Sequence, residues 1–300
     1  MVTFDYLEPK SLEEACALLN EHGDDARLIA GGTALIIMMR QRLLNPRVVI
    51  SLTSIPNFDY ITFDAKDGLR LGAGARHRDI ELAKPVHEHY PLLHETFRKV
   101  AQPRIRNMGT IGGNLVQGDP LTDPGASLIA LDAEVTLKNA GGQRVIPVEK
   151  FFVDYYQTDL QPGEILTEIH VPPSPPGLAW AHIKFLPRSL EDFATVGVAL
   201  TMRLGGDRCE DIRLAFNSVA PIIMRAKRAE EVLRGQKIDD DRVGKMAEVA
   251  STEVDPMDDN RGSAEYKREL VRVLVRRAVN QALDRASAAK PSGRQAPAPA

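Results

Sequence analysis

Cysteine and aromatic residues are scarce in this sequence of 300 residues. It has two cysteines, Cys16 and Cys209, and one tryptophan, and aromatic residues make up 5% of the chain. Cys16 falls on the apolar side of an expected helix, where a buried thiol acts as a small hydrophobic group. An iron–sulfur cluster needs about four thiolates. Any iron–sulfur chemistry linked to this chain must therefore reside on another protein.

Long apolar runs and a strong net charge are also missing. No stretch approaches the roughly 20 apolar residues of a membrane span, and the first six residues lack the basic and apolar regions of a signal peptide. The net charge is −3 and the isoelectric point about 6.2, which gives no reason to expect binding to nucleic acid or to an anionic membrane. We expect a cytoplasmic protein with no membrane span and no nucleic-acid partner.

Two glycine pairs organise the chain. The first is Ala30-Gly31-Gly32-Thr33, which follows an extended apolar run, and the second is Thr110-Ile111-Gly112-Gly113-Asn114. Glycine accepts positive φ and lets another group approach the backbone closely. Two such loops can direct several N–H donors at one anion, with a pyrophosphate as the natural candidate. Taken singly, each pair also fits an ordinary tight turn.

The remaining pattern predicts a mixed α and β chain. A capping box at Ser11 and Glu14 starts a helix over 11–22, and a strand at 27–30, a helix at 34–44 and a strand at 47–52 form a β-α-β unit. A hairpin, a helical region over 78–102 and a second hairpin follow, up to a proline-rich linker near 172–177. Beyond it we expect strands at 181–187, 194–204 and 210–217, helices at 224–234, 240–251 and 263–285, and a loose tail at 286–300.

The motifs around the glycine pairs resemble those of a known family. The first pair is followed by a helix that stops at Asn45-Pro46, and the second lies within Arg106-Asn107-Met108-Gly109-Thr110 and is followed by Asp119-Pro120 and Asp123. With the strings "LQPGEILTEIHVP" and "DDNRGSAEYKRELVRVLVRRA", this pattern is similar to the FAD-binding medium subunit of molybdenum hydroxylases. That family includes aerobic carbon monoxide dehydrogenase and xanthine dehydrogenase.

The resemblance implies a fold of the α+β class. Residues 1–177 would form a two-lobed FAD-binding domain of the vanillyl-alcohol-oxidase type, with lobes at about 1–56 and 57–177. Residues 178–285 would form a C-terminal α+β domain with a small antiparallel sheet and helices. The same resemblance implies an FAD site, and the flavin would be noncovalent because neither glycine pair contains a histidine or cysteine.

The resemblance assigns residues to parts of the flavin. The pyrophosphate would lie between the glycine pairs, Asp123 would bind the ribityl hydroxyls, Leu166 would wall the ring and Lys184 would supply a cation at its N1–C2=O edge. Asp123 fits a helix N-cap before Pro124 equally well. The full expected set is Leu28, Ile29, Ala30, Gly31, Gly32, Thr33, Ala34, Leu35, Ala101, Thr110, Ile111, Gly112, Gly113, Asn114, Asp123, Leu166 and Lys184.

No catalytic or metal-binding set is predicted within this chain. G-x-S-x-G and H-E-x-x-H are absent, and His87, His89 and His94 are expected on the surface. The resemblance implies instead an electron route: a large molybdenum–pterin subunit oxidises the substrate, two [2Fe-2S] clusters on a small subunit carry electrons to FAD, and a quinone or NAD accepts them. It also implies a dimer of heterotrimers.

Two other readings remain open from the sequence. One is a stand-alone FAD oxidase of the vanillyl-alcohol-oxidase type, which would need a substrate pocket and catalytic residues in the C-terminal part. The other is an assembly subunit that binds no flavin, since the first loop has Gly32-Thr33 where many relatives carry histidine or glutamine followed by serine. Thr33 retains the hydroxyl, which favours binding. The substrate of the molybdenum subunit, whether carbon monoxide, a purine, an aldehyde or an N-heterocycle, is not determined.

Overall fold

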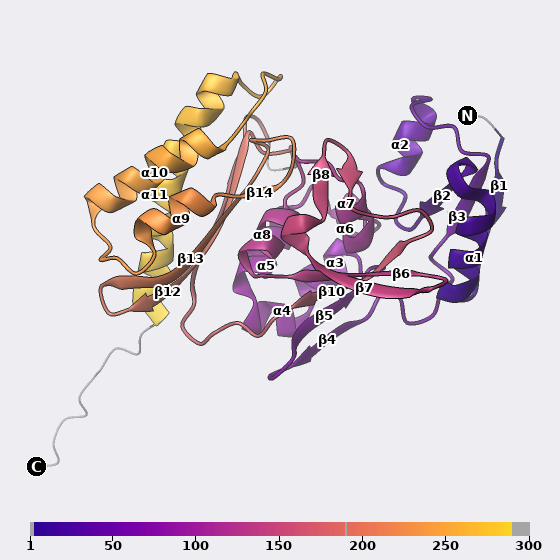
Figure 1. Ribbon diagram of the computed structural model, residues 1–300, viewed down its shortest axis with the longest axis horizontal. Coiled ribbons are helices and arrows are strands. Elements are labelled where there is room, and N and C mark those ends of the chain that lie inside the picture. The colour runs from indigo at the N-terminus through magenta and orange to yellow at the C-terminus, as the bar shows by residue number, and fades with distance from the viewer. Residues whose placement is uncertain (1–2, 190, 290–300) are drawn as a thin grey trace, which may run out of the picture.

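The computed structural model describes residues 3–189 and 191–289. The first lobe is small and contains a parallel sheet in the order β1-β3-β2 with two helices (Figure 1). Its elements are β1 (Asp5–Leu7), α1 (Leu12–His22), β2 (Ala26–Ile29), α2 (Leu35–Arg40) and β3 (Val48–Ser51). The predicted β-α-β unit is present, and β1 is a strand that the sequence pattern did not reveal.

The ends of the two helices in this lobe differ in how well the sequence predicted them. Ser11 caps α1 by accepting a hydrogen bond from the Glu14 N–H at 3.1 Å, and Gly23 ends it, as expected from the capping box. The helix predicted over 34–44 stops at Arg40, so its last turn was wrong. Arg42 has a φ of 61°, which breaks the helix before the asparagine–proline pair is reached.

The second lobe has an antiparallel five-stranded sheet in the order β4-β5-β10-β6-β7, with short helices packed on it. The strands are β4 (Ile61–Asp64), β5 (Gly68–Gly72), β6 (Glu134–Asn139), β7 (Gly142–Pro147) and β10 (Ile165–Val171), with a separate hairpin of β8 (Phe152–Asp154) and β9 (Gln157–Thr158). The helices are α3 (His77–Leu82), α4 (Lys84–His89), α5 (Pro91–Lys99), α6 (Pro103–Arg106), α7 (Ile111–Val116) and α8 (Pro124–Ala130).

The C-terminal part has an antiparallel sheet in the order β11-β12-β13-β14, covered on its outer face by three helices (Figure 1). Its elements are β11 (Ala179–Phe185), β12 (Val196–Gly205), β13 (Arg208–Asn217), β14 (Met224–Arg225), α9 (Lys227–Leu233), α10 (Asp240–Glu253) and α11 (Ala264–Ala289). Helix α11 runs to Ala289 rather than ending at 285, so the tail expected over 286–300 is helical at its start; residues 290–300 lie outside the described residues.

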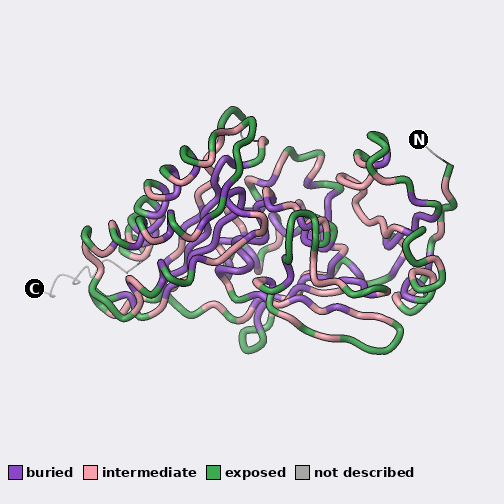
Figure 2. Tube along the Cα trace, turned by 45° about the horizontal axis from the view of Figure 1, so that its top comes forward, coloured by how far each residue is buried: buried purple, intermediate pink, exposed green. Residues whose placement is uncertain are grey.

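The inner face of this sheet docks on the second lobe, which explains why β12 is buried on both faces from Val196 to Met202 (Figure 2). Gly197, Ala199 and Ala215 make this face flat, and the fully buried helix α8 lies against it. Contacts at each end of α8 hold it there. At its C-terminal end the Thr201 hydroxyl donates to the Ala130 carbonyl at 2.8 Å, and at its N-terminal end the Asp123 carboxylate meets Lys184.

Candidate functional site

The fold brings the two glycine pairs together, although they are about eighty residues apart in the sequence. The first pair follows β2 and leads into α2. A Cβ at Gly31 would lie 2.0 Å from the Met108 carbonyl oxygen and 2.9 Å from the Gly109 Cα. Only glycine allows this backbone approach. Gly31 therefore fixes the distance between the first loop and the segment that precedes the second pair.

The first loop presents a run of free N–H donors. The helical ladder of α2 begins with the Ile36 N–H, which donates to the Gly32 carbonyl at 3.1 Å. Within the described part of the chain, nothing accepts a hydrogen bond from the N–H groups of residues 31–35. These residues are all partly exposed, and Gly32 has a φ of 68°. Successive free N–H groups at a turn and helix start form an anion-binding concavity.

The second glycine pair does not form an open loop, which corrects the sequence expectation. Gly112 and Gly113 lie in the first turn of α7, where their N–H groups donate to the Ala73 carbonyl at 2.9 Å and to the Thr110 hydroxyl at 3.2 Å. The Ile111 N–H donates to the Ala75 carbonyl at 2.9 Å. These donors are already used within the protein. The free backbone donors of the site come from the first loop.

Gly112 has a packing role instead. A Cβ there would lie 2.6 Å from the Ala73 Cβ and 2.7 Å from the Ala73 carbonyl oxygen, so the missing side chain lets α7 rest on the segment after β5. The polar group that α7 leaves without a partner is the Asn114 side chain, whose Oδ1 is buried and accepts no hydrogen bond from the described residues. An orphaned buried amide oxygen is a natural contact for a bound hydroxyl or N–H group.

His77 lies behind the second glycine segment and was missed from the sequence. Its N–H donates to the Gly109 carbonyl at 2.9 Å, and a Cβ at Gly109 would lie 3.1 Å from the imidazole Cδ2. The ring is buried, and its Nδ1 has no hydrogen-bond partner among the described residues. Burial, with the nearby Arg106 charge as the second cause, lowers the pKa of His77 to about 4. No sequence pattern indicates that His77 is buried behind the second glycine segment, because a single histidine at a helix start is not distinctive.

Acidification is expected to destabilise the protein through His77. Its folded-state pKa of about 4 lies below the ordinary value of 6.5, so the unfolded chain binds the proton first and stability is lost as the pH falls from about 6.5 towards 4. A shift of this size corresponds to about 3 kcal/mol. Urea unfolding at pH 7 and pH 5 should show a smaller pH effect for His77→Gln than for the unmodified chain. Equal pH effects in the His77→Gln variant and the unmodified chain would show that protonation of His77 does not cause the loss of stability.

Ala101 occupies a turn that a buried ion pair holds in place. Arg106 donates through Nη1 to the carbonyls of Val100 and Ala101 at 2.9 Å each, and its Nε lies 2.9 Å from Glu81 Oε2. Ala101 has a φ of 40°, a conformation that costs energy for a residue with a Cβ. The arginine offsets that cost by satisfying both carbonyls. Arg106 is thus a further residue that supports the predicted site.

Asp123 and Lys184, which were expected to contact different parts of a flavin, are paired with each other. Asp123 Oδ2 lies 2.8 Å from Lys184 Nζ, which also donates to the Lys99 carbonyl at 2.7 Å. Both side chains are buried, with 5% and 2% of their surfaces exposed. Asp123 does stand at the N-cap position of α8, as predicted, but its carboxylate makes no capping hydrogen bond to that helix. Burial raises the pKa of Asp123, while the Lys184 charge opposes that rise.

Leu166 lies on β10 at a bulge next to the second glycine pair. The Ala73 N–H donates to the Thr167 carbonyl at 2.9 Å, and the Ala73 carbonyl accepts from Gly112, so one residue bridges β10 and α7. Leu166 is buried in the core of the second lobe. The predicted residues therefore fall into three groups. The first is the first glycine loop, which lies against Met108; the second is the start of α7 together with Leu166; the third is the Asp123–Lys184 pair.

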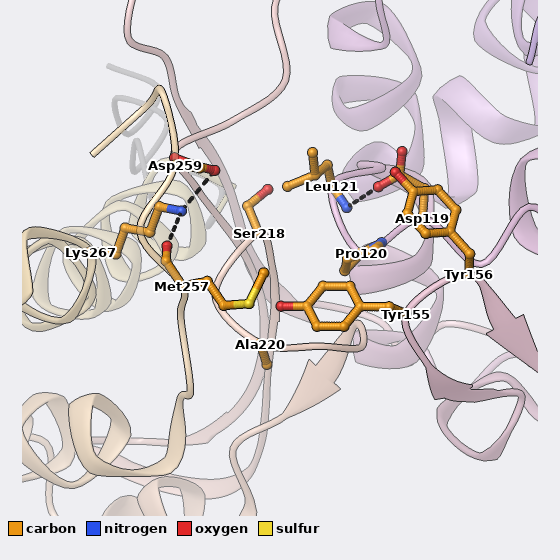
Figure 3. A pocket seen from close by; sticks show the side chains of 10 residues that line it. All are labelled: Asp119, Pro120, Leu121, Tyr155, Tyr156, Ser218, Ala220, Met257, Asp259 and Lys267. Carbon is orange, nitrogen blue, oxygen red and sulfur yellow. Dashed lines mark hydrogen bonds and ion pairs between the residues drawn. The ribbon is translucent and has the colours of Figure 1, made fainter. Parts of the chain in front are cut away.

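A cavity of about 230 Å³ lies next to the Asp123 loop, between the second lobe and the C-terminal part (Figure 3). Tyr155 and Tyr156 flank it on one side, and Lys267 lies on the other with Nζ 2.9 Å from both Asp259 Oδ2 and the Met257 carbonyl (Figure 3). Burial raises the pKa of Asp119 in its wall. The lining holds no nucleophile paired with a base, the arrangement expected of covalent catalysis.

Residues 3–189 and 191–289 contain neither a metal-binding cluster of side chains nor a membrane-spanning helix. No group of three or more histidine, cysteine or acidic side chains is arranged to hold a metal ion. None of the helices there combines the length and apolar character needed to cross a membrane.

Comparison with known proteins places this geometry in a family. Residues 2–174 match the model of the FAD binding domain in molybdopterin dehydrogenase, and residues 181–282 match that of the CO dehydrogenase flavoprotein C-terminal domain. The carbon monoxide dehydrogenase medium chain of Hydrogenophaga pseudoflava is 37% identical over 93% of this chain and 96% of its own length. The glyceraldehyde dehydrogenase medium chain of Sulfolobus acidocaldarius is 35% identical over 93% and 98%.

Solved structures agree with the sequence matches. A carbon monoxide dehydrogenase chain from Hydrogenophaga pseudoflava superposes with a TM-score of 0.92 at 37% identity, covering 95% of this chain and 99% of that one. Quinoline 2-oxidoreductase from Pseudomonas putida 86 superposes with a TM-score of 0.88 at 29% identity, covering 95% and 98%. The predicted α+β fold is confirmed. The chain belongs to the family of FAD-binding medium subunits of molybdenum-containing dehydrogenases and is a subunit of an FAD-dependent oxidoreductase.

Proposed function

We propose that this chain binds FAD noncovalently and serves as the electron-transfer subunit of a molybdenum-containing dehydrogenase complex. The observation that carries the proposal is the run of free N–H groups at residues 31–35, set against Met108 and Gly109. A run of backbone N–H donors can bind the negative charge of a pyrophosphate without the help of a lysine. The orphaned Asn114 Oδ1 at the neighbouring helix start adds a hydrogen-bond acceptor for the same ligand.

The residues that would hold FAD follow from this grouping. The first loop would bind the pyrophosphate through its backbone, and Thr33 and Thr110 would add hydroxyl contacts. The Asp123–Lys184 pair would meet the ribityl and ring end, with Leu166 as an apolar wall. The proposed set is Leu28, Ile29, Ala30, Gly31, Gly32, Thr33, Ala34, Leu35, Ala101, Thr110, Ile111, Gly112, Gly113, Asn114, Asp123, Leu166 and Lys184.

The chain's own residues would bind and orient the cofactor rather than break substrate bonds. When bound, FAD supplies a carrier that accepts single electrons and delivers two to an acceptor. Lys184 would place positive charge beside the ring, where reduction adds negative charge. Its charge is held in position by Asp123 and by the Lys99 carbonyl. The buried surroundings strengthen this electrostatic effect because they lower the local dielectric.

We further propose that partner chains supply the other redox centres. This chain has two cysteines and an iron–sulfur cluster needs about four thiolates, so the clusters would lie on partner chains. The relatives are named as medium chains or subunits, which supports the presence of further subunits. We propose that these are a small iron–sulfur subunit and a large molybdenum-cofactor subunit, and that the complex is a dimer of heterotrimers. Carbon monoxide dehydrogenase is the model for the route, with a quinone or NAD as acceptor. We propose that the complex is cytoplasmic. Within this chain, we propose an FAD-binding domain at 1–177 and a C-terminal domain at 178–285.

The first test is the absorption spectrum of the purified chain before and after heat or acid release. We expect flavin bands, with yellow colour released to the supernatant and identified as FAD rather than FMN by chromatography. Colour that stays with the precipitate would mean covalent flavin and would support the stand-alone oxidase. A colourless chain that takes up no added FAD, even when expressed with its partners, would support the assembly subunit.

The partner proposal needs a separate measurement. A tagged chain expressed in its native host should co-purify with two further chains and with iron and molybdenum in the same chromatographic fraction. Native mass spectrometry of that fraction should show two copies of each chain. A flavin-loaded chain that purifies alone and carries neither metal would contradict the proposed assembly while leaving FAD binding intact.

A further inference from the structure

Asn217 lies beside the Asp123–Lys184 pair, at the end of β13, and is almost completely buried. Lys184, Gly197 and Asn217 face one another on three adjacent strands, because Lys184 is opposite Gly197 and Gly197 is opposite Asn217 in the register of the sheet. Residues of one register row point to the same face. This row belongs to the inner face of the sheet, on which α8 and the Asp123 loop rest.

Gly197 makes room for the asparagine. A Cβ at this position would lie 1.8 Å from Asn217 Oδ1 and 2.6 Å from its Cγ, so the amide side chain occupies the space that any other residue would fill. Its φ is not in the left-handed region, so backbone conformation does not explain the glycine. The absence of a side chain at 197 is therefore a steric requirement of the Asn217 position.

The Asn217 side chain donates hydrogen bonds to the loop that carries Asp123. Asn217 Nδ2 lies 3.2 Å from the Leu121 carbonyl, 3.3 Å from Ser218 Oγ and 3.5 Å from Asp123 Oδ1. The next residue adds a backbone contact, because the Ser218 N–H donates to the Pro120 carbonyl at 2.8 Å. Lys184 contacts the other carboxylate oxygen, Oδ2. Lys184 and Asn217, at the two ends of the row, thus contact the two different oxygens of the buried Asp123 carboxylate.

We infer that Asn217, in the space left by Gly197, is a positioning residue of the flavin site: it holds the Asp123 loop and carboxylate so that Lys184 and Asp123 are set for the cofactor. This inference rests on the proposed function and extends it to residues outside the expected set. A buried carboxylate held by one charged and one neutral donor has a defined orientation, whereas a carboxylate with lysine alone can rotate about its Cβ–Cγ bond.

A double-mutant cycle between Asn217 and Asp123 tests this. Asn217→Ala should raise the dissociation constant of FAD from the purified chain about tenfold, and it should shift the absorption bands of the bound flavin. The same substitution in an Asp123→Asn background should add little, because Asn217 acts through that carboxylate. Gly197→Ala should weaken FAD binding as Asn217→Ala does, since its Cβ displaces the amide without removing it.

Thr201→Val provides the matched control. It removes a buried hydrogen bond between the same sheet and the other end of α8, the one from Thr201 to the Ala130 carbonyl. It should lower thermal stability as Asn217→Ala does, with FAD affinity and the flavin spectrum unchanged.

The outcomes separate the inference from the proposed function. An unmodified chain that binds FAD, together with equal affinities for the Asn217→Ala and Thr201→Val variants, would overturn the inference and leave the function standing. Full additivity of the Asn217 and Asp123 substitutions would also overturn it. An unmodified chain that binds no FAD under any condition would overturn both.

Discussion

Gly31→Ala is expected to weaken FAD binding severely, because the first loop lies directly against the backbone of the Met108–Gly109 segment. The added Cβ would lie 2.0 Å from the Met108 carbonyl oxygen, and backbone atoms on both sides prevent a cheap local adjustment. The first loop must then move away from the Met108–Gly109 segment. We expect at least a hundredfold weaker binding, equivalent to about 2.7 kcal/mol, measured by fluorescence titration of the flavin-free chain with FAD.

Gly141→Ala is the control for this substitution. Gly141 lies in the β6–β7 turn, and a Cβ there would lie 3.4 Å from its nearest neighbour, which is an ordinary contact. The FAD affinity of the Gly141→Ala variant should equal that of the unmodified chain. If Gly31→Ala retained full affinity while its circular dichroism remained native, the first loop could not be the pyrophosphate site.

Lys184→Met is expected to reduce the free energy of unfolding by about 3–5 kcal/mol, the usual cost of leaving one buried charge without its partner. Asp123 would remain buried with its carboxylate facing the Asn217 amide alone. Its pKa is already raised by burial, and losing the lysine should raise it further. Urea unfolding at pH 7 measures the loss.

The pH dependence of that variant has a defined sign. An acid whose folded-state pKa is raised binds its proton more tightly in the folded chain, so the folded state loses stability as the pH rises through the interval between the two pKa values. Relative to the unmodified chain at the same pH, Lys184→Met should therefore recover part of its lost stability when the pH falls from 7 to 5. The double variant with Asp123→Asn should recover at pH 7, because the unpaired charge is gone.

A surface ion pair provides the comparison. Arg203 and Glu210 lie 2.9 Å apart with about half of each side chain exposed, and Arg203→Met should change the unfolding free energy by less than about 1 kcal/mol. Equal losses for Lys184→Met and Arg203→Met would show that burial of the Asp123–Lys184 pair does not matter. Failure of the Asp123→Asn substitution to restore stability would contradict the unpaired-charge explanation.

Local sequence signals predicted the elements of this chain well. The capping box at Ser11 describes a contact between near neighbours, and each glycine pair marks a backbone requirement of single residues. These signals, with the family motifs, were sufficient for the α+β class and the FAD-binding family. They did not predict the end of α2, where Arg42 takes a φ of 61° and stops the helix before the asparagine–proline pair.

The chemistry of the site depended on contacts that no local pattern encodes. Gly112 was expected to expose its N–H to a phosphate, yet packing against Ala73 uses that donor. Asp123 stands at the N-cap position of α8, yet its carboxylate pairs with Lys184 from the C-terminal part instead of capping the helix. Such outcomes depend on which distant segment arrives, because a buried donor or charge binds the partner that the fold brings nearest.

The amino-acid sequence alone established the kind of protein, because the glycine pairs, the family motifs and the scarcity of cysteine depend only on residue identity and order. The folded arrangement alone showed that residues 31–35 hold the free donors, and that Lys184, Gly197 and Asn217 form one row beneath Asp123. The physical reason is distance. Hydrogen bonds and ion pairs act over about 3–4 Å, and only folding brings residues sixty to a hundred positions apart within that range.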